Sequence, residues 1–306
     1  MARPVALITP SYAGDLERFS LLCESLDRRV TGYARHYVIV SDDDMPLFQA
    51  FNSQSRIVLP GSQFLPRWLR RAPGIKLRNG RKIWWSLRAR PVHGWHVQQI
   101  LKIAASMEMP EQRFCLIDSD NVFVRPFDVG AYAGGDRSPL YLQREAITAE
   151  APLHATWTRN CDRLLGHTQT SFPADDYIGH VIVWDKDAVR GMASQIERAT
   201  GLAWPLALCR TRAFSEYLLY GHFVKRSPQR RAEHQTTTDS LAISYWSDTP
   251  LDAATVAEMI SEAAPTKVAL SVPSFSHTPV AMIRAAAGLA ARVATCDAPG
   301  RLHDAA

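Results

Sequence analysis

The sequence has no uninterrupted apolar run of the roughly 18 residues that a membrane-spanning helix needs, so we expect no transmembrane segment. Its first apolar run, residues 5–8, is too short for a signal peptide and is soon followed by Asp15 and Glu17. The five cysteines are scattered and none has CxxC spacing, which argues against a disulfide framework and a thiolate zinc site. We therefore expect a protein of the reducing cytoplasm.

Acidic residues are missing from residues 65–92, although this stretch contains nine Arg or Lys. The whole chain has a net charge of only +5, so the remainder is net negative. Trp68, Trp84 and Trp85 are interleaved with these basic residues. Because residues 60–92 are also rich in Pro and Gly, we predict a long mobile insertion there.

Two functions fit such a basic, tryptophan-containing insertion. It would act as a flap that closes over an anionic donor. Alternatively, it would rest on anionic lipid at the inner membrane face and receive a lipid-linked acceptor, which makes the protein peripheral to the membrane. No nucleic-acid-binding motif accompanies the basic residues, so nucleic acid is not an expected partner.

Apolar runs and helical periodicity alternate along the rest of the chain. Strands are predicted at residues 5–9, 37–40, 114–117, 181–184 and 268–272, and helices at 15–29, 93–107, 186–199, 214–220 and 252–264. This alternation predicts an α/β protein, a single domain over residues 1–306, with a mainly parallel central sheet and helices on both faces. An Ala-rich helix is predicted at about residues 279–296.

Asp118 and Asp120 belong to an Asp-Ser-Asp segment that directly follows the apolar run at residues 114–117. Two carboxylates at this spacing, just past the end of a strand, can both turn toward one point. Hard divalent cations prefer oxygen ligands, and ligands of open α/β sheets bind at the carboxyl ends of strands. The segment therefore predicts a Mn²⁺ or Mg²⁺ site that bridges diphosphate oxygens. A polar turn without a metal is the alternative.

Several segments, taken in order, resemble those of GT-A glycosyltransferases. RFCLIDSDNVFVRPF (113–127) resembles their metal-binding segment. The others are LITPSY (7–12) for the first strand and nucleotide loop, VIVSD (38–42) for the second strand, GWHVQQILK (94–102) for the helix before the metal strand, FSEYLLYG (214–221) for the acidic acceptor motif and SFSH (274–277) for the late metal-site histidine. Together they resemble a bacterial family of glycosyltransferases associated with surface polysaccharide.

The resemblance implies a GT-A-like fold and a metal-dependent transfer of a sugar from a nucleotide-sugar donor, most simply a UDP-sugar. The acceptor would be a hydroxyl of a saccharide or lipid-linked acceptor, in cell-surface polysaccharide or glycolipid synthesis. The implied metal ligands are Asp118, Asp120 and His277, the donor-binding residues are Thr9, Tyr12, Asp15, Asp42, Gln98, Lys102 and Ser119, and the catalytic residues are Glu216, as general base, and Asp176.

Each of these assignments has a plainer structural alternative. Asp15 also fits the N-cap of the following helix, and Glu216 fits a first-turn acid that compensates the helix dipole. Lys102 also fits a solvated helical face, and His277 a packed or surface histidine. The residues alone leave both interpretations open.

Three other functions are compatible with parts of the sequence. Asp118 also fits the nucleophile of a haloacid-dehalogenase-type, Mg²⁺-dependent phosphatase, but that motif normally opens its domain, whereas here about a third of the chain precedes it. A non-catalytic nucleotide-sugar-binding protein would keep the fold without the reaction. A nucleotidyltransferase needs a Gly-rich loop after its first strand, and residues 10–14 contain one glycine.

Overall fold

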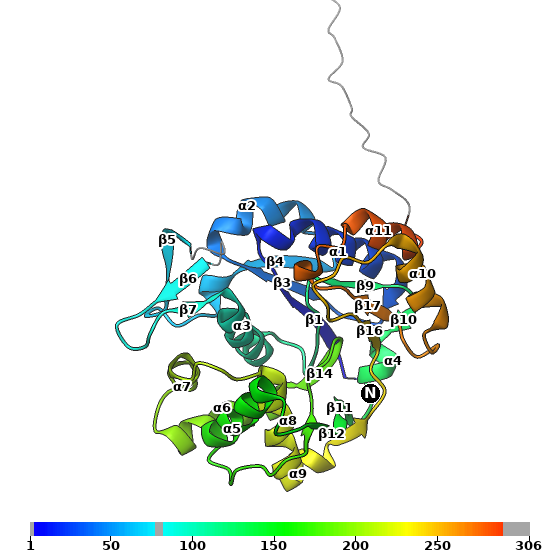
Figure 1. Ribbon diagram of the computed structural model, residues 1–306. Helices are drawn as coiled ribbons and strands as arrows, with labels where there is room; N and C mark the ends of the chain where they lie inside the picture. The colour runs from blue at the N-terminus through cyan, green and yellow to red at the C-terminus, as the bar shows by residue number, and fades with distance from the viewer. Residues whose placement is uncertain (1–2, 77–81, 290–306) are drawn as a thin grey trace, which may run out of the picture.

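The computed structural model describes residues 3–76 and 82–289, and its centre is a five-stranded sheet (Figure 1). The strands are, in spatial order, β14 (Ile182–Asp185), β8 (Arg113–Leu116), β1 (Val5–Pro10), β3 (His36–Val40) and β4 (Arg56–Pro60). β1 is parallel to β8 and β3, and β3 is parallel to β4, whereas β14 is antiparallel to β8. The α/β class and the parallel-rich central sheet are thus confirmed.

Helices cover both faces of this sheet because successive strand residues point to opposite sides. In β1, Ala6 and Ile8 pack in one apolar cluster, and Val5 and Leu7 pack in another. The first cluster contains residues of α3 (Gly94–Glu108), α6 (Lys186–Thr200) and α8 (Glu216–Arg226), and the second contains residues of α1 (Leu16–Arg29). Both faces of β1 are therefore buried, which explains its continuous apolar run.

The remaining elements vary in length and lie around this centre. The other helices are α2 (Met45–Phe48), α4 (Val129–Ala133), α5 (Pro152–Leu165), α7 (Trp204–Arg210), α9 (Pro228–Ala232), α10 (Ala253–Glu262) and α11 (Val280–Ala286). Three two-stranded sheets pair β2 (Val30–Thr31) with β10 (Phe127–Asp128), β11 (Ser138–Tyr141) with β15 (His234–Thr237), and β12 (Gln143–Ile147) with β13 (Ala174–Asp176).

A second sheet begins directly after the Asp-Ser-Asp segment. It consists of β16 (Ala242–Ser244), β17 (Ala269–Ser271) and β9 (Asn121–Phe123), and Ser271 is paired with Asn121. The pairing brings the chain after residue 271, which includes His277, to the same edge as Asp120.

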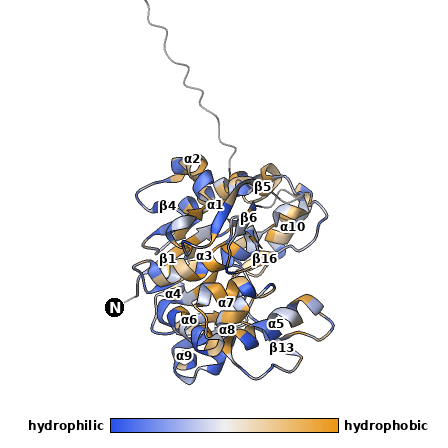
Figure 2. Ribbon diagram, turned by 90° about the vertical axis from the view of Figure 1, so that its left-hand side faces the viewer, coloured by the Kyte–Doolittle hydropathy of each residue, from blue (hydrophilic) through white to orange (hydrophobic). Residues whose placement is uncertain are grey.

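Part of the segment 60–92, which was predicted as a long mobile insertion, forms regular strands. An antiparallel sheet is formed by the strands β5 (Arg70–Lys76), β6 (Lys82–Trp85) and β7 (Val92–His93). It packs beside α3, on the same side of the molecule as α7 (Figures 1 and 2). Trp84 is buried, whereas its neighbour Trp85 is exposed, as the alternation of a strand requires.

Some basic residues of this segment have acidic partners, which the sequence of the segment did not suggest. Arg71 forms an ion pair with Asp43, and Lys82 forms one with Asp44. Acids that lie about thirty to forty positions earlier in the chain therefore offset part of the charge. The side chains of Lys76, Arg78 and Arg81 lie outside the described residues.

The C-terminal helix is shorter than predicted. α11 ends at Ala286, and Gly288 adopts a positive φ of 64°, a conformation that cannot continue a helix. Residues 290–296 of the predicted helix lie outside the described part of the chain. Within residues 3–76 and 82–289, every helix is too short or too polar to cross a lipid bilayer.

Candidate functional site

The predicted metal segment lies where β1 and β8 end side by side. The two strands are parallel neighbours, so Asp15, after β1, and Ser119, after β8, leave the sheet at the same edge. The Ser119 hydroxyl donates a hydrogen bond of 3.1 Å to Asp15 Oδ2. Two residues predicted from separate motifs are thus in direct contact.

Lys102 of α3 is the centre of the cluster. Its Nζ lies 2.8 Å from Asp118 Oδ1 and 2.9 Å from Glu216 Oε1, and it donates to the Tyr217 hydroxyl at 2.9 Å. The side chains of Lys102 and Glu216 are each only 5% exposed, whereas that of Asp118 is 37% exposed. The alternative that Lys102 occupies a solvated helical face is therefore wrong, and Asp118 is the member of the cluster that solvent reaches.

The charge of Lys102 is stabilised by its partners. Burial opposes a charged ammonium, but the carboxylates of Asp118 and Glu216 outweigh it, so the pKa of Lys102 is raised well above its usual value. Burial and the charge of Asp118 likewise raise the pKa of Tyr217, which remains a neutral hydrogen-bonding phenol.

Asp120 lies in a strongly negative, desolvated environment. Burial, followed by the charges of Asp118 and Asp15, raises the pKa of Asp120 to about 7. Burial also raises the pKa of Asp15, although hydrogen bonds from Ser119 and Tyr12 oppose this shift. This edge of the sheet therefore carries the carboxylates of Asp15, Asp118 and Asp120 together with two cationic side chains: Lys102, which pairs with Asp118, and Arg18, whose charge opposes the pKa shifts of Asp15 and Asp120. The excess of carboxylates attracts a cation.

The donor atoms of this edge fit a hard divalent cation. They are oxygens. The side-chain amide nitrogen of Asn121 donates to Asp118 O and Asp120 Oδ1. The buried Oδ1 of Asn121 has no hydrogen-bond partner among the described residues. Mg²⁺ and Mn²⁺ in nucleotide sites are held by one or two carboxylates together with phosphate oxygens. Asp118 and Asp120 meet that requirement.

The predicted three-residue metal site, however, is not assembled. In the part of the chain that the structure describes, no three His, Cys, Asp or Glu side chains are grouped so that they would bind one metal ion. The segment of His277 does reach the site, since Val272 N donates to Asp120 O at 3.2 Å. His277 itself is exposed and ends a short 3-10 turn with a φ of 56°.

A histidine and two exposed aromatics complete this edge, and no motif had indicated their roles. His180 interacts electrostatically with both Asp118 and Lys102, and its buried Nδ1 has no hydrogen-bond partner among the described residues. Burial lowers the pKa of His180 to about 4, so its imidazole is neutral near pH 7. Its ring stacks on Trp246, which also contacts Phe275, with centroid distances of 5.9 Å in both pairs. Trp246 is 64% exposed, which a sequence pattern does not reveal.

The predicted general base, Glu216, is held by protein groups on both sides. Lys102 Nζ donates a hydrogen bond to Glu216 Oε1, and the backbone N of Glu216 donates to Gln99 Oε1 at 3.1 Å. A buried carboxylate in this position is better suited to fixing Lys102 than to removing a proton from a solvent-borne acceptor. The contact with α8 comes from Gln99, while Gln98, which was predicted to bind the donor, is half-buried on the same helix.

The other predicted donor-binding residues lie in different surroundings. Thr9 is fully buried and its Oγ1 lies 3.0 Å from His36 Nε2, so it does not face a ligand. Asp42 accepts hydrogen bonds from both the backbone N and the hydroxyl of Ser62. Tyr12 is 39% exposed, and its side chain also hydrogen-bonds to Asp15.

The predicted catalytic Asp176 belongs to a separate set of contacts. Its Oδ1 accepts a hydrogen bond from Ile178 N, and its Oδ2 lies 3.5 Å from His154 Nδ1. Burial raises its pKa. His154 stacks on Trp157, which contacts Trp95, so Asp176 adjoins a row of aromatic rings.

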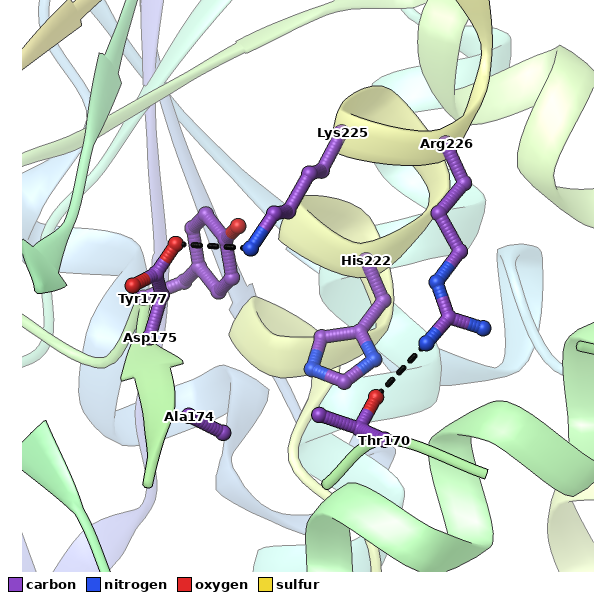
Figure 3. Close-up of a pocket in the computed structure, with 7 residues that line it drawn as sticks. All are labelled: Thr170, Ala174, Asp175, Tyr177, His222, Lys225 and Arg226. Atoms are coloured by element: carbon purple, nitrogen blue, oxygen red, sulfur yellow. Dashed lines mark hydrogen bonds and ion pairs between the residues drawn. The ribbon is translucent and has the colours of Figure 1, made fainter. Parts of the chain in front are cut away.

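A cavity of about 80 Å³ lies elsewhere, between β13 and α8 (Figure 3). Its polar side chains are paired with one another: Lys225 with Asp175, and Arg226 with Thr170. Small-molecule sites usually span about 300–1,000 Å³. The cavity is therefore too small for a nucleotide sugar. Its charged groups are already paired, and of its other polar groups the buried hydroxyl of Tyr177 has no hydrogen-bond partner among the described residues.

Comparison with known proteins identifies one family. A family model described as "Family of unknown function (DUF6492)" matches residues 4–286. No curated protein matches the chain.

Proposed function

Since the chain belongs to DUF6492, a family of unknown function, we propose its activity from the site alone: it transfers a sugar from a nucleotide-sugar donor to a hydroxyl acceptor, with Mn²⁺ or Mg²⁺. One observation carries the proposal. Lys102, buried and charged, bridges Asp118 and Glu216 at the carboxyl edge of a parallel-rich sheet, next to the carboxylates of Asp15 and Asp120.

The arrangement of the sheet supports a GT-A-like fold. The Asp-Ser-Asp segment follows a central strand, β8, and leads into the separate small sheet that begins with β9. In open α/β sheets, nucleotides bind outside the carboxyl ends of the strands. Tyr12 and Asp15, which follow β1 at that edge, are the residues we assign to the nucleoside.

The residues of the chain have distinct roles in this proposal. Asp118 and Asp120 hold the cation, which when bound supplies positive charge to the diphosphate as it departs. Lys102 adds an ammonium for the same phosphates. Because Glu216 and Tyr217 already orient this ammonium, the protein does not have to rearrange around it during the reaction. Trp246 and Phe275 offer an exposed apolar face to the sugar or base.

The acceptor is a saccharide or a lipid-linked saccharide in this proposal. The row of rings formed by His154, Trp157 and Trp95 suits a sugar, because aromatic rings pack on the apolar faces of pyranoses. The neighbouring carboxylate of Asp176 would accept hydrogen bonds from the sugar hydroxyls. Asp176 is the residue we assign to the acceptor.

The test is a thermal-shift titration with UDP-, GDP- and CDP-sugars, with and without Mn²⁺. We expect a Mn²⁺-dependent rise in Tm with one nucleotide class, and its loss in Asp120→Asn. Asp187→Asn, which changes an exposed aspartate of α6, is the matched control and should respond like the wild type. Absence of any nucleotide response would rule the proposal out.

Product analysis separates this activity from the phosphatase alternative. Slow Mn²⁺-dependent hydrolysis of the responding nucleotide sugar to sugar and nucleoside diphosphate supports the transferase. Turnover of generic phosphate monoesters, with a covalent intermediate at Asp118, would instead support the phosphatase. Nucleotide binding without turnover over a broad acceptor panel would indicate a binding protein.

A further inference from the structure

A groove of about 450 Å³ opens between the chain that follows β6 and the end of α7. Two stretches that lie far apart in the sequence line it. They contribute Leu87, Arg88, Ala89 and Arg90 from the β6–β7 connection, and Cys209, Arg210 and Arg212 from the end of α7 and the turn after it. We call this surface the arginine groove.

Four exposed arginines give the arginine groove a concentrated positive charge. They are Arg88, Arg90, Arg210 and Arg212. Unlike Arg71 and Lys82 earlier in the same segment, none of the four forms an ion pair within the described residues. Like charges held together without acids raise the electrostatic potential locally and favour an extended anionic partner.

The apolar residues beside these arginines point outward. Leu87 is 96% exposed, and Trp85, two residues earlier, is 45% exposed. Trp95, at the start of the adjoining α3, is 43% exposed. Scattered exposed apolar residues are normal, but an almost fully exposed leucine followed by Arg88 and Arg90 has the composition of a surface that lies in a lipid interface.

The arginine groove is built on well-packed elements. Arg210 Nε donates to Arg88 O at 3.1 Å and joins its two sides. His96 of α3 contacts Leu208 O of α7 at 3.0 Å. Beneath Trp85, the ring of Trp84 is buried against α3. These contacts fix the backbone on both sides of the arginine groove before any partner binds, which reduces the entropic cost of docking.

We propose that the arginine groove docks the protein on an anionic lipid surface, with Leu87 and Trp85 entering the interface and the four arginines meeting the phosphate headgroups. Both kinds of residue point to this partner. Soluble phosphates need the arginines but not an exposed leucine, and nucleic acid is bound through charge and through base stacking on aromatic rings. A lipid bilayer binds both kinds of residue, because its phosphate headgroups attract the arginines and its acyl region accommodates Leu87.

The test is co-sedimentation of the full chain with vesicles of phosphatidylcholine alone or mixed equally with phosphatidylglycerol. We expect binding to the mixed vesicles only, weakening as salt is added. Arg88→Glu/Arg90→Glu and Arg210→Glu/Arg212→Glu should each weaken it at least about tenfold, because each basic residue near an anionic surface contributes about fivefold. Leu87→Asp should weaken it at constant arginine content.

Matched controls change the same residue types elsewhere. Arg198→Glu/Arg231→Glu carries the same charge change on α6 and α9, and Leu47→Asp changes a half-exposed leucine of α2. Both should lose much less vesicle binding than the groove variants. Circular dichroism should confirm that every variant is folded.

Three results would overturn the docking proposal. One is no binding to the mixed vesicles at low salt. Another is an equal loss of binding in the control and groove variants. The third is single-stranded RNA binding that depends on the arginines, together with vesicle binding that is unaffected by Leu87→Asp, which would identify nucleic acid as the partner. The nucleotide-sugar thermal shift of the groove variants should match the wild type, so failure here leaves the proposed function untouched.

Discussion

Lys102 Nζ and Asp118 Oδ1 lie 2.8 Å apart, and this ion pair ties α3 to the turn after β8. The two partners differ in exposure, since the lysine side chain is 5% exposed and the aspartate side chain 37%. A cation that binds Asp118 therefore approaches from solvent and competes with Lys102 for the carboxylate. Phosphate groups bound to that cation would in turn offer Lys102 new oxygens.

Replacing Lys102 with methionine should destabilise the fold, because it leaves the buried carboxylate of Glu216 without its counter-ion. Loss of one partner of a buried pair costs about 3–5 kcal/mol, and we expect about 3 kcal/mol here because Asp118 can turn to solvent. Urea unfolding measures the change. Lys225→Met, which removes a pair with Asp175 whose lysine is 56% exposed, is the control and should cost less than about 1 kcal/mol.

The double variant Lys102→Met/Glu216→Gln tests the same explanation. Neutralising Glu216 removes the uncompensated charge and should recover about half of the lost free energy of unfolding. If the double variant is less stable than Lys102→Met alone, the ion pair is not the reason for the loss.

Asp120→Asn should stabilise the ligand-free protein while abolishing its response to Mn²⁺ and nucleotide. The reason is that Asp120 is desolvated and repelled by Asp118 and Asp15, which costs at least about 1 kcal/mol that an uncharged amide avoids. A higher Tm without Mn²⁺, together with no Mn²⁺-dependent shift, is the expected result. A clear loss of stability would mean that Asp120 has a structural role that its surroundings do not reveal.

Buried histidines should lower the stability as the pH falls from 7 to 5, while protonation of Asp120, whose pKa is about 7, acts in the opposite direction. Burial lowers the pKa of His96 to about 4, lowers that of His36 well below its usual value, and lowers that of His234. Because the folded pKa values lie below the unfolded value of about 6.5, the unfolded chain binds more protons in this range, and protonation favours unfolding. For His96 alone the loss by pH 5 is about 2 kcal/mol.

Urea midpoints measured across this pH range check the prediction. His96→Gln keeps a donor for Leu208 O but does not titrate, so its midpoint should depend less steeply on pH than that of the wild type. Equal slopes for the two proteins would contradict the assignment.

Gly221→Ala should disturb the site from the far side of α8. An added Cβ would lie 2.1 Å from Tyr177 Cγ, so either the ring or the helix that carries Glu216 must move. We expect a loss of about 2 kcal/mol in thermal unfolding, together with weaker nucleotide binding. Gly135→Ala, where nothing lies within 4 Å of the new Cβ, is the control and should stay within about 0.5 kcal/mol of the wild type.

Much of the central fold was predictable because its signals are local. β1, β3 and β8 are continuous apolar runs, and such runs are what strands buried on both faces require. The sheet around Trp84 was missed for the opposite reason. Its strands are short and rich in charge, and the acids that offset Arg71 and Lys82 come from another part of the chain.

The sequence by itself determined that Asp118 and Asp120 follow a buried strand, because an apolar run followed by two carboxylates is a local pattern. Only the tertiary structure decided that Lys102 and Glu216, 114 positions apart, share one hydrogen bond, and that the same ammonium pairs with Asp118. The physical reason is that contacts between α3, α8 and the β8 turn depend on how helices pack on the sheet. Helical periodicity marks which face of α3 is apolar, but it does not identify what a lysine at the border of that face will meet.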